Sequence, residues 1–390
     1  MKERFSCCCL SEIPKNSFTF VKTIPLKSDN CDLTLRKCRF CLPKHINSIS
    51  MKLLFALFLA LISASTFGQN YPKPVALNAQ HHFKATVPKG NYSGITWLGG
   101  NRYAVVSDKT ERSGFYIFTL DIDLNTGDIK QVVSDGFFGS LASNADEEGI
   151  AFHSDRNSLF IAHEADNTIY EYDLSGNLTG KALVVPAAFR NASHIYGLES
   201  LTYNAATHLF WTTTESTLET DGKQAAPMQL LENRLRLQAF DESLQPVAQY
   251  AYKMDKSTVN KPAMNYAMGV ADMVALDNGM LLVLERELYV APKKLGSFVK
   301  NKLYSVDTNT AQQIDSDNPL TDASPYMQKQ LLAEWKTSLT LFRQDFANYE
   351  GMCLGPKLND GSQVLILCAD SQNQYGGILR DWFRTIVFRY

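Results

Sequence analysis

Residues 146–173, DEEGIAFHSDRNSLFIAHEADNTIYEYD, contain the unit that the rest of the chain repeats. The stretch predicts three short strands, because two apolar runs and one alternating run are separated by polar turns. The first two strands form a hairpin. If its turn is centred on Arg156, Glu148 and Glu164 face each other across it.

The same hairpin can be counted four more times along the chain. Asn278-Gly279 and Asp360-Gly361 are strong hairpin turns and centre two of these copies. The copies place Glu199 opposite Glu215, Asp272 opposite Glu285, Glu350 within one residue of Asp370, and Asp108 opposite Gly94. The five hairpins are therefore predicted to bring nine carboxylates to the same end of their strands.

The spacing of the strands predicts an all-β fold, a β-propeller of five four-stranded blades. A degenerate sixth blade within residues 301–345 is the alternative. The last blade has three strands of its own, and we expect residues 83–87 to supply the fourth and close the ring. Residues 315–334 predict an insertion with a short helix.

The beginning of the chain differs from the rest. Residues 51–68 combine Met51-Lys52, an apolar run and small residues, which is typical of a secretory signal peptide and too short to span a membrane. We interpret residues 1–50 as a mis-annotated upstream extension and residues 71–390 as a single domain. A zinc site on the cysteines of the extension is the alternative, but their spacing fits no common zinc finger. We expect a secreted or periplasmic protein.

The composition excludes some classes of partner. Removing residues 1–68 takes away ten basic and four acidic residues, so the formal net charge changes from −2 to −8. Nucleic-acid binding calls for basic patches, which an acidic chain does not favour. No later apolar run is long enough to span a membrane. We expect a monomer with a small-molecule partner.

Carboxylates on successive inner strands would converge on one mouth of the central channel. Such a group of like charges needs a cation, a base or bound protons. Oxygen ligands of this kind suit Ca²⁺ or Mg²⁺. The predicted metal ligands are Asp108, Glu148, Glu199, Asp272 and Glu350. The alternative is that each acid accepts hydrogen bonds from backbone groups of its own blade.

Other polar residues at the strand ends are candidates for catalysis and substrate binding. The predicted catalytic residues are Glu164, Glu285, Arg286 and Asp370, and the predicted substrate-binding residues are Lys109, Arg112, Asn373 and Arg380. Arg286 lies between two glutamates, so a purely structural ion pair is the alternative for it. A serine-hydrolase mechanism has no support, because no G-x-S-x-G motif is present.

Two cysteines remain after residue 68, and hairpin counting sets Cys353 opposite Cys368. In an oxidising compartment they could form a disulfide. Two buried thiols are the alternative.

The motifs SGITW with VVSDK, DEEGIAFH with HEADN, GLESLTY with TTES, VLERE, and NYEGMC with CADSQNQ resemble the phytase-like family described as having esterase-like activity. The resemblance covers roughly residues 91–390, implies a secreted propeller and suggests a hydrolase of phosphoesters or carboxylesters. Together with the predicted metal ligands, it leads us to expect divalent-metal-assisted hydrolysis at the channel mouth. Glu199-Ser200 departs from the Glu-Gly of two other repeats. A lactonase-like hydrolase and a non-enzymatic propeller that binds a ligand or partner are the alternatives.

Overall fold

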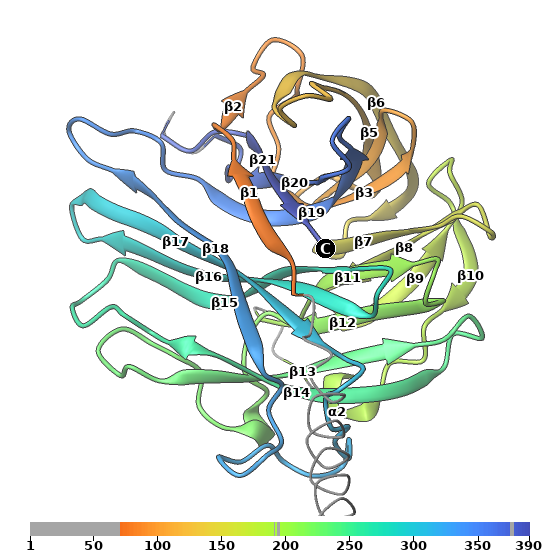
Figure 1. Cartoon of the computed structure of the whole chain (residues 1–390), viewed down its shortest axis with the longest axis vertical. Coiled ribbons are helices and arrows are strands. Elements are labelled where there is room, and N and C mark those ends of the chain that lie inside the picture. Colours follow the sequence, from red (N-terminus) through yellow and green to blue (C-terminus); the bar gives the residue numbers. More distant parts are fainter. Residues whose placement is uncertain (1–70, 191, 193–195, 375–377) are drawn as a thin grey trace, which may run out of the picture. The chain divides into compact units, whose positions relative to one another are not determined.

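The computed structural model describes residues 71–390, except 191, 193–195 and 375–377. Our interpretations of residues 1–50 and 51–68 therefore lie outside the described residues. The described chain is all-β, with five four-stranded antiparallel sheets arranged as the blades of a propeller (Figure 1). The only helices in this part are the short α2 (Ala187–Arg190) and the 3₁₀ helix η1 (Glu219–Asp221). No helix of the described residues is long and apolar enough to cross a membrane.

The first four blades each use four consecutive strands. Blade 1 contains β3 (Tyr92–Gly99), β4 (Arg102–Ser107), β5 (Arg112–Ile122) and β6 (Ile129–Ser143). Blade 2 contains β7 (Glu147–His153), β8 (Ser158–His163), β9 (Thr168–Tyr172) and β10 (Leu178–Ala182). Blade 3 contains β11 (Leu198–Asn204), β12 (Leu209–Thr214), β13 (Glu232–Phe240) and β14 (Pro246–Lys256). Blade 4 contains β15 (Asn265–Ala275), β16 (Met280–Ala291), β17 (Lys294–Asp307) and β18 (Lys329–Leu339).

Blade 5 combines both ends of the described chain. It contains β19 (Asn348–Lys357), β20 (Gln363–Asp370), β21 (Trp382–Arg389) and the N-terminal β1 (Lys73–Leu77), and the two-residue β2 (His81–His82) also pairs with β21. The predicted closure by an N-terminal strand is confirmed, but the predicted segment 83–87 is wrong. The chain turns there instead, because the Val87 amide donates a hydrogen bond to the Phe83 carbonyl.

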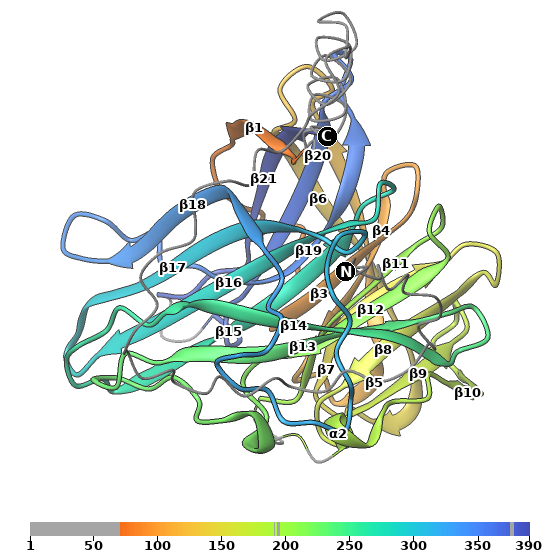
Figure 2. The ribbon, with the colours of Figure 1, turned by 60° about the horizontal axis from the view of Figure 1, so that its bottom comes forward.

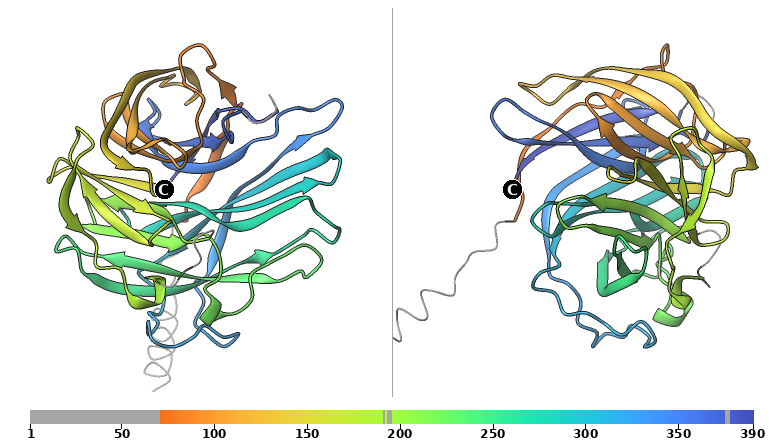
Figure 3. Two further views of the ribbon diagram at one scale, coloured as in Figure 1. Left: turned by 180° about the vertical axis from the view of Figure 1, so that it is seen from behind. Right: turned by 90° about the vertical axis from the view of Figure 1, so that its right-hand side faces the viewer.

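The first strand of each blade faces the channel, and these inner strands β3, β7, β11, β15 and β19 pack against one another in a ring. Figure 3 shows the arrangement of the blades from two further sides. The blades stack through apolar side chains. Between blades 1 and 2, for example, Ala104 and Val106 pack with Ile150, Leu159 and Ile161, all almost fully buried. Because both faces of most strands are covered, the core extends around the whole ring.

The connection between β17 and β18 is an insertion, and a sixth blade is not formed within the described residues. The predicted short helix is also wrong, since none of the described residues of this connection is helical. The insertion is fixed to blade 3 instead. The buried Arg236 guanidinium pairs with Asp221 at 2.6 Å and donates a hydrogen bond to the Asn318 carbonyl at 2.6 Å.

Candidate functional site

A β-bulge interrupts the pairing of the first two strands in every blade. In blade 1, Tyr92 pairs with Ser107 but Gly94 pairs with Val106, so Ser93 is the extra residue on β3. Equivalent shifts occur in the other four blades. The residues that share this position are Ser93, Glu148, Glu199, Ala271 and Glu350. They form the inner ring of the site at one mouth of the channel.

The predicted facing pairs are wrong, because the ladders are already displaced on the turn side of the bulges and shift again at the bulges, whereas counting from a turn assumes an uninterrupted ladder. On the mouth side of the bulges the pairs are Tyr92 with Ser107, Glu147 with His163, Leu198 with Thr214, Val270 with Glu285, and Tyr349 with Ala369. Most of the predicted acids nevertheless lie together at one end of the strands, since they influence one another's pKa values.

Asp272 is not equivalent to Glu148, Glu199 and Glu350, which corrects the predicted alignment. It follows the bulge residue Ala271 and corresponds to the glycine of the Glu-Gly repeats. At this level the inner strands lie close together, since a Cβ on Gly149 would be 2.4 Å from the Leu201 nitrogen. The Asp272 carboxylate accepts hydrogen bonds from the backbone amides of Met273 at 2.8 Å and Met352 at 2.6 Å. It therefore links β15 to β19 and is not part of the inner ring.

On each second strand, one residue pairs with the residue that directly precedes the bulge, and these partners are Ser107, His163, Thr214, Glu285 and Ala369. The residue that follows each of them belongs to a second ring. Its members are Asp108, Glu164, Glu215, Arg286 and Asp370. Blade 4 thus differs from the others in both rings, with Ala271 in the inner ring and Arg286 in the outer ring. We call the two rings together the acidic cluster.

Glu285, the predicted counterpart of the other acids, points to the opposite face of β16, as neighbouring residues on a strand do. Its carboxylate accepts hydrogen bonds from the Tyr252 hydroxyl at 2.7 Å, the Lys329 amine at 2.5 Å and the Asp255 amide at 3.1 Å. It therefore lies between blades 3 and 4 and outside the acidic cluster. Sequence reasoning had no signal for choosing between Glu285 and Arg286, because the choice depends on the bulge.

Arg286 joins the rings across three blades. Its Nη1 donates to the Glu350 carboxylate and, at 3.1 Å, to the Asn348 side-chain oxygen, and its Nη2 donates to the Glu215 carboxylate. The Asn348 side chain in turn donates to Glu350 at 2.8 Å. The guanidinium is 4% exposed, so it is a buried countercharge to carboxylates of blades 3 and 5.

The two rings hold seven carboxylates and one guanidinium, and burial disfavours the charged forms of the carboxylates. Burial raises the pKa of Glu164, Glu350 and Asp370 to about 7, and burial together with Asp370 raises the pKa of Asp108 to about 6. Burial and the neighbouring acids raise the pKa of Glu148 and Glu199 well above the ordinary range. Near neutral pH the acidic cluster therefore holds protons, unless a cation replaces them.

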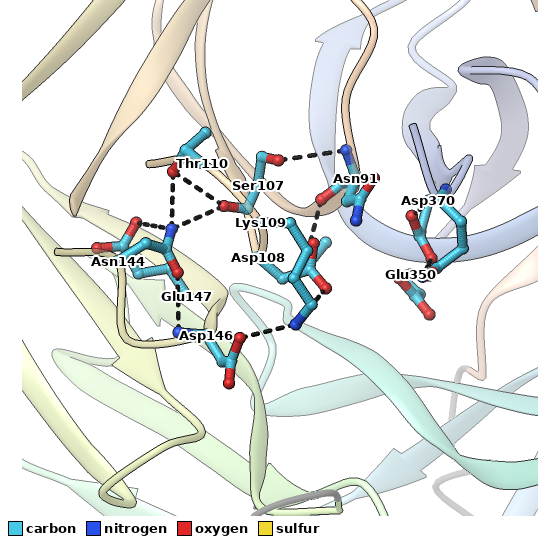
Figure 4. A network of polar contacts seen from close by, with 12 residues as sticks. Asn91, Ser107, Asp108, Lys109, Thr110, Asn144, Asp146, Glu147, Glu350 and Asp370 are labelled. Atoms are coloured by element: carbon cyan, nitrogen blue, oxygen red, sulfur yellow. Dashed lines mark hydrogen bonds and ion pairs between the residues drawn. The ribbon is translucent and has the colours of Figure 1, made fainter. Parts of the chain in front are cut away.

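Lys109 is the predicted substrate-binding residue that the structure places beside the acidic cluster. Figure 4 shows its amine between Asp108, at 3.1 Å, and Asp146, at 2.7 Å. Asn373 is tied to the same edge, because its amide donates to the Asn91 side chain at 2.6 Å. Arg112 is exposed at the start of β5, and Arg380 lies over the Trp382 ring. No hydrogen bond or ion pair joins either arginine to the acidic cluster within the described residues.

The acidic cluster has the donor chemistry that Ca²⁺ or Mg²⁺ prefers. Asp108 Oδ1 is buried without a hydrogen-bond partner among the described residues. As placed, however, no group of three or more His, Cys, Asp or Glu side chains in the described part of the chain has the spacing of a metal site. The carboxylate oxygens are the type of ligand that a hard cation prefers, but their positions do not form a metal site. Metal binding therefore stays a prediction.

Two polar residues of the site were missed by sequence reasoning. Asn348 bonds both Arg286 and Glu350, and it lies two residues before Glu350 in the NYEG motif. Glu147 is fully buried between blades 1 and 2, where its carboxylate accepts a hydrogen bond from the Gly114 amide at 3.1 Å. Burial raises the pKa of Glu147 to about 7. The sequence analysis selected the neighbouring Glu148 and missed Glu147. The two carboxylates lie on different sides of the strand.

The two cysteines do not face each other. Cys353 pairs with Ile366, whereas Cys368 pairs with Gly351, because the ladder shifts between Leu354 and Lys357, on the turn side of both pairs. Both are buried free thiols.

Two cavities adjoin the channel. One of about 350 Å³ lies beside the acidic cluster and is lined by residues of blades 4 and 5, including Asn348. The other, of about 550 Å³, is lined by the far halves of the five inner strands, with Trp97, Phe152 and Tyr203 on its wall. The acidic cluster and the larger cavity thus lie toward opposite ends of the same channel.

The fold and site together define a five-bladed β-propeller with an acidic cluster at one channel mouth. Residues 87–372 match the family described as "Phytase-like: Esterase-like activity of phytase", and the chain belongs to this family. No curated protein matches the sequence.

Solved structures with similar folds share little sequence with this chain. An endo-arabinase from Bacteroides thetaiotaomicron has 11% identity and a TM-score of 0.42, covering 80% of this chain and 98% of its own. A member of the DUF4221 family from Bacteroides vulgatus has 9% identity and a TM-score of 0.39, covering 82% and 99%. A virginiamycin B lyase from Staphylococcus aureus has 9% identity and a TM-score of 0.35, covering 80% and 99%.

The raised pKa values of the acidic cluster predict how stability depends on pH. The folded protein keeps protons that the unfolded chain loses above about pH 4.3, so this contribution to stability is complete below that pH and is lost as the pH rises through about 7. We expect Tm in EDTA to fall by roughly 5 °C or more from pH 5 to pH 8. Glu199→Gln should reduce this fall, and the surface variant Glu334→Gln should not. A Tm that rises from pH 5 to pH 8 would contradict the prediction.

Replacing Arg286 tests its role as the buried countercharge. Arg286→Met leaves Glu215 and Glu350 unpaired, and we expect it to lower the free energy of unfolding by about 3–5 kcal/mol at pH 8 in urea titrations. The loss should be smaller at pH 5, where both acids can protonate, and adding Glu215→Gln and Glu350→Gln should restore part of it. The exposed Arg389→Met serves as control, with a change of about 0.5 kcal/mol or less.

Proposed function

We propose that this protein is a hydrolase of phosphoesters or carboxylesters that works at the acidic mouth of the channel. The observation that carries this proposal is the pair of rings in which seven carboxylates, five of them buried, gather at the channel mouth with Arg286 among them. Membership of a family described by esterase-like activity supports the reaction class. Clustered carboxylates with perturbed pKa values are also a common mark of functional sites.

Carboxylates with a pKa near 7 can exchange protons at neutral pH, which general acid–base catalysis requires. Glu164, Glu350 and Asp370 are the candidates. One of them would take a proton from the attacking water as its oxygen bonds to the acyl carbon or phosphorus. The bond to the leaving oxygen would then break, and a protonated neighbour would supply the leaving alcohol with its proton.

The basic groups would position the carboxylates and bind the substrate. Arg286 is held by Glu215 and Glu350, so it is a positioning residue that keeps these carboxylates in place. Lys109 is half-exposed at the mouth and could bind an anionic part of the substrate. A bound Ca²⁺ or Mg²⁺, held by Asp108, Glu148, Glu199 and Glu350, would supply Lewis-acid polarisation of the ester and favour ionised carboxylates. Asp272 is excluded from this set by its two backbone hydrogen bonds.

The test is an assay of the protein from Tyr71 onward on p-nitrophenyl phosphate and short p-nitrophenyl acyl esters, with Ca²⁺ or with EDTA. We expect hydrolysis of at least one substrate and a loss of about 100-fold or more in kcat for Glu148→Gln or Glu350→Gln. Glu334→Gln should keep full activity. Hydrolysis that is indifferent to EDTA and to Glu148→Gln would rule out the metal-assisted form.

A non-enzymatic ligand-binding function is the second candidate. The 550 Å³ cavity at the other end of the channel favours it, because ligand sites are concave, mostly apolar and often lined by aromatic side chains. A protein that binds a ligand there and hydrolyses neither class of ester would support this function over the first.

We also propose that residues 51–68 direct export of the protein. Expression from Met51 in a bacterial host should yield a periplasmic or secreted protein whose first residue, identified by mass spectrometry, lies between residues 65 and 71. A cytoplasmic product that retains Met51 would contradict the proposal.

A further inference from the structure

The cavity of about 350 Å³ beside the acidic cluster has mainly apolar walls. Blade 4 contributes β16 and the end of β18, and blade 5 contributes the segments that precede β19 and β21. The apolar side chains that line it are Leu288, Val290, Leu339, Phe346, Ile378 and Leu379. Its size falls in the range of pockets that bind small organic ligands.

An extension of blade 4 builds one wall of this cavity. β16 continues to Ala291, six residues past Glu285, whereas the second strands of the other blades end at or one residue beyond the equivalent level. The long hairpins of blade 4 are visible in Figure 2. Successive side chains of the extension point to opposite faces of the strand. Glu287 and Tyr289 contact the loop around Val259, so Leu288 and Val290 face the other way, toward the cavity.

The cavity and the acidic cluster share the same face of β16. Residues on one strand face repeat every second position, so Arg286, Leu288 and Val290 project to the same side. Asn348, which bonds Arg286 at 3.1 Å and Glu350 at 2.8 Å, also lines the cavity. Gln372, another lining residue, donates its amide to Asp370 at 2.7 Å. A ligand that fills the cavity would therefore end at the carboxylates.

We propose that this cavity binds the apolar acyl chain of a neutral carboxylester, with the ester group at the edge formed by Asn348 and Glu350. The inference rests on the proposed function and narrows it. The apolar walls match a hydrocarbon chain, and the excess of carboxylates over basic groups disfavours a dianionic phosphate at this edge. The chain length sets the specificity, since each buried methylene group favours binding by about four-fold.

Kinetics on p-nitrophenyl esters with acyl chains of two, four and eight carbons test the proposal with the full chain. We expect kcat/KM to rise by about four-fold per methylene group for the unmodified protein. Val290→Trp fills the cavity from its half-buried rim and should abolish this rise, so that kcat/KM no longer depends on the length of the acyl chain. Val247→Trp, at a similarly placed but distant exposed position on β14, should keep the rise.

A binding measurement separates this inference from the proposed function. The neutral probe N-phenyl-1-naphthylamine should gain fluorescence with the unmodified protein and with Val247→Trp, lose that gain with Val290→Trp, and be displaced by octan-1-ol. Binding of this kind without ester hydrolysis would support the cavity and overturn the proposed function. Hydrolysis with rates independent of chain length and unchanged by Val290→Trp would overturn the inference and leave the proposed function standing. Equal probe binding to both tryptophan variants would also overturn it.

Discussion

The ion pairs of Arg286 with Glu215 and Glu350 are the interactions on which the site depends. Burying several carboxylates together is strongly unfavourable without a countercharge. A single guanidinium can serve carboxylates on both sides, because its donors are arranged as a rigid fork. Arg286 therefore fixes the relative positions of blades 3, 4 and 5 at the mouth. The other acids remain only partly compensated, and burial raises the pKa of Glu164 and Asp370 to about 7.

The repeated bulge decides which side chains belong to the site. The bulge adds one residue to each inner strand. On the mouth side of the bulge, each side chain therefore points to the opposite face of the sheet from the face it would have in an uninterrupted ladder. The bulge residues Glu148, Glu199 and Glu350 consequently join the acidic cluster, while Asp272, one residue further on, bonds the backbone of the next inner strand. A one-residue difference thus separates a candidate functional carboxylate from a structural one.

The blade count, the hairpins and the clustering of acids could be predicted, because turn residues and alternating strands are local signals. The register could not, because a bulge leaves no local mark in sequences such as EGIAF or ADMVA. Because the register could not be predicted, the role of Arg286 was missed, and Glu285 and Cys353 were placed wrongly. The closing strand was assigned to residues 83–87 instead of β1, since any short apolar segment near the N-terminus satisfies the same pattern.

Most departures from five-fold symmetry in the two rings fall on blade 4, and the remaining one is Ser93 in the inner ring of blade 1. Blade 4 has Ala271 in place of an inner acid, Arg286 in place of an outer acid, and a hairpin that continues past the mouth. The small Ala271 side chain and the cation together remove two carboxylates from that side, and the extension covers it with apolar groups. A symmetric ring of acids would favour a cation on its axis. This asymmetric one favours a ligand that enters along blade 4, with a polar end at Glu350 and an apolar end against Leu288 and Val290.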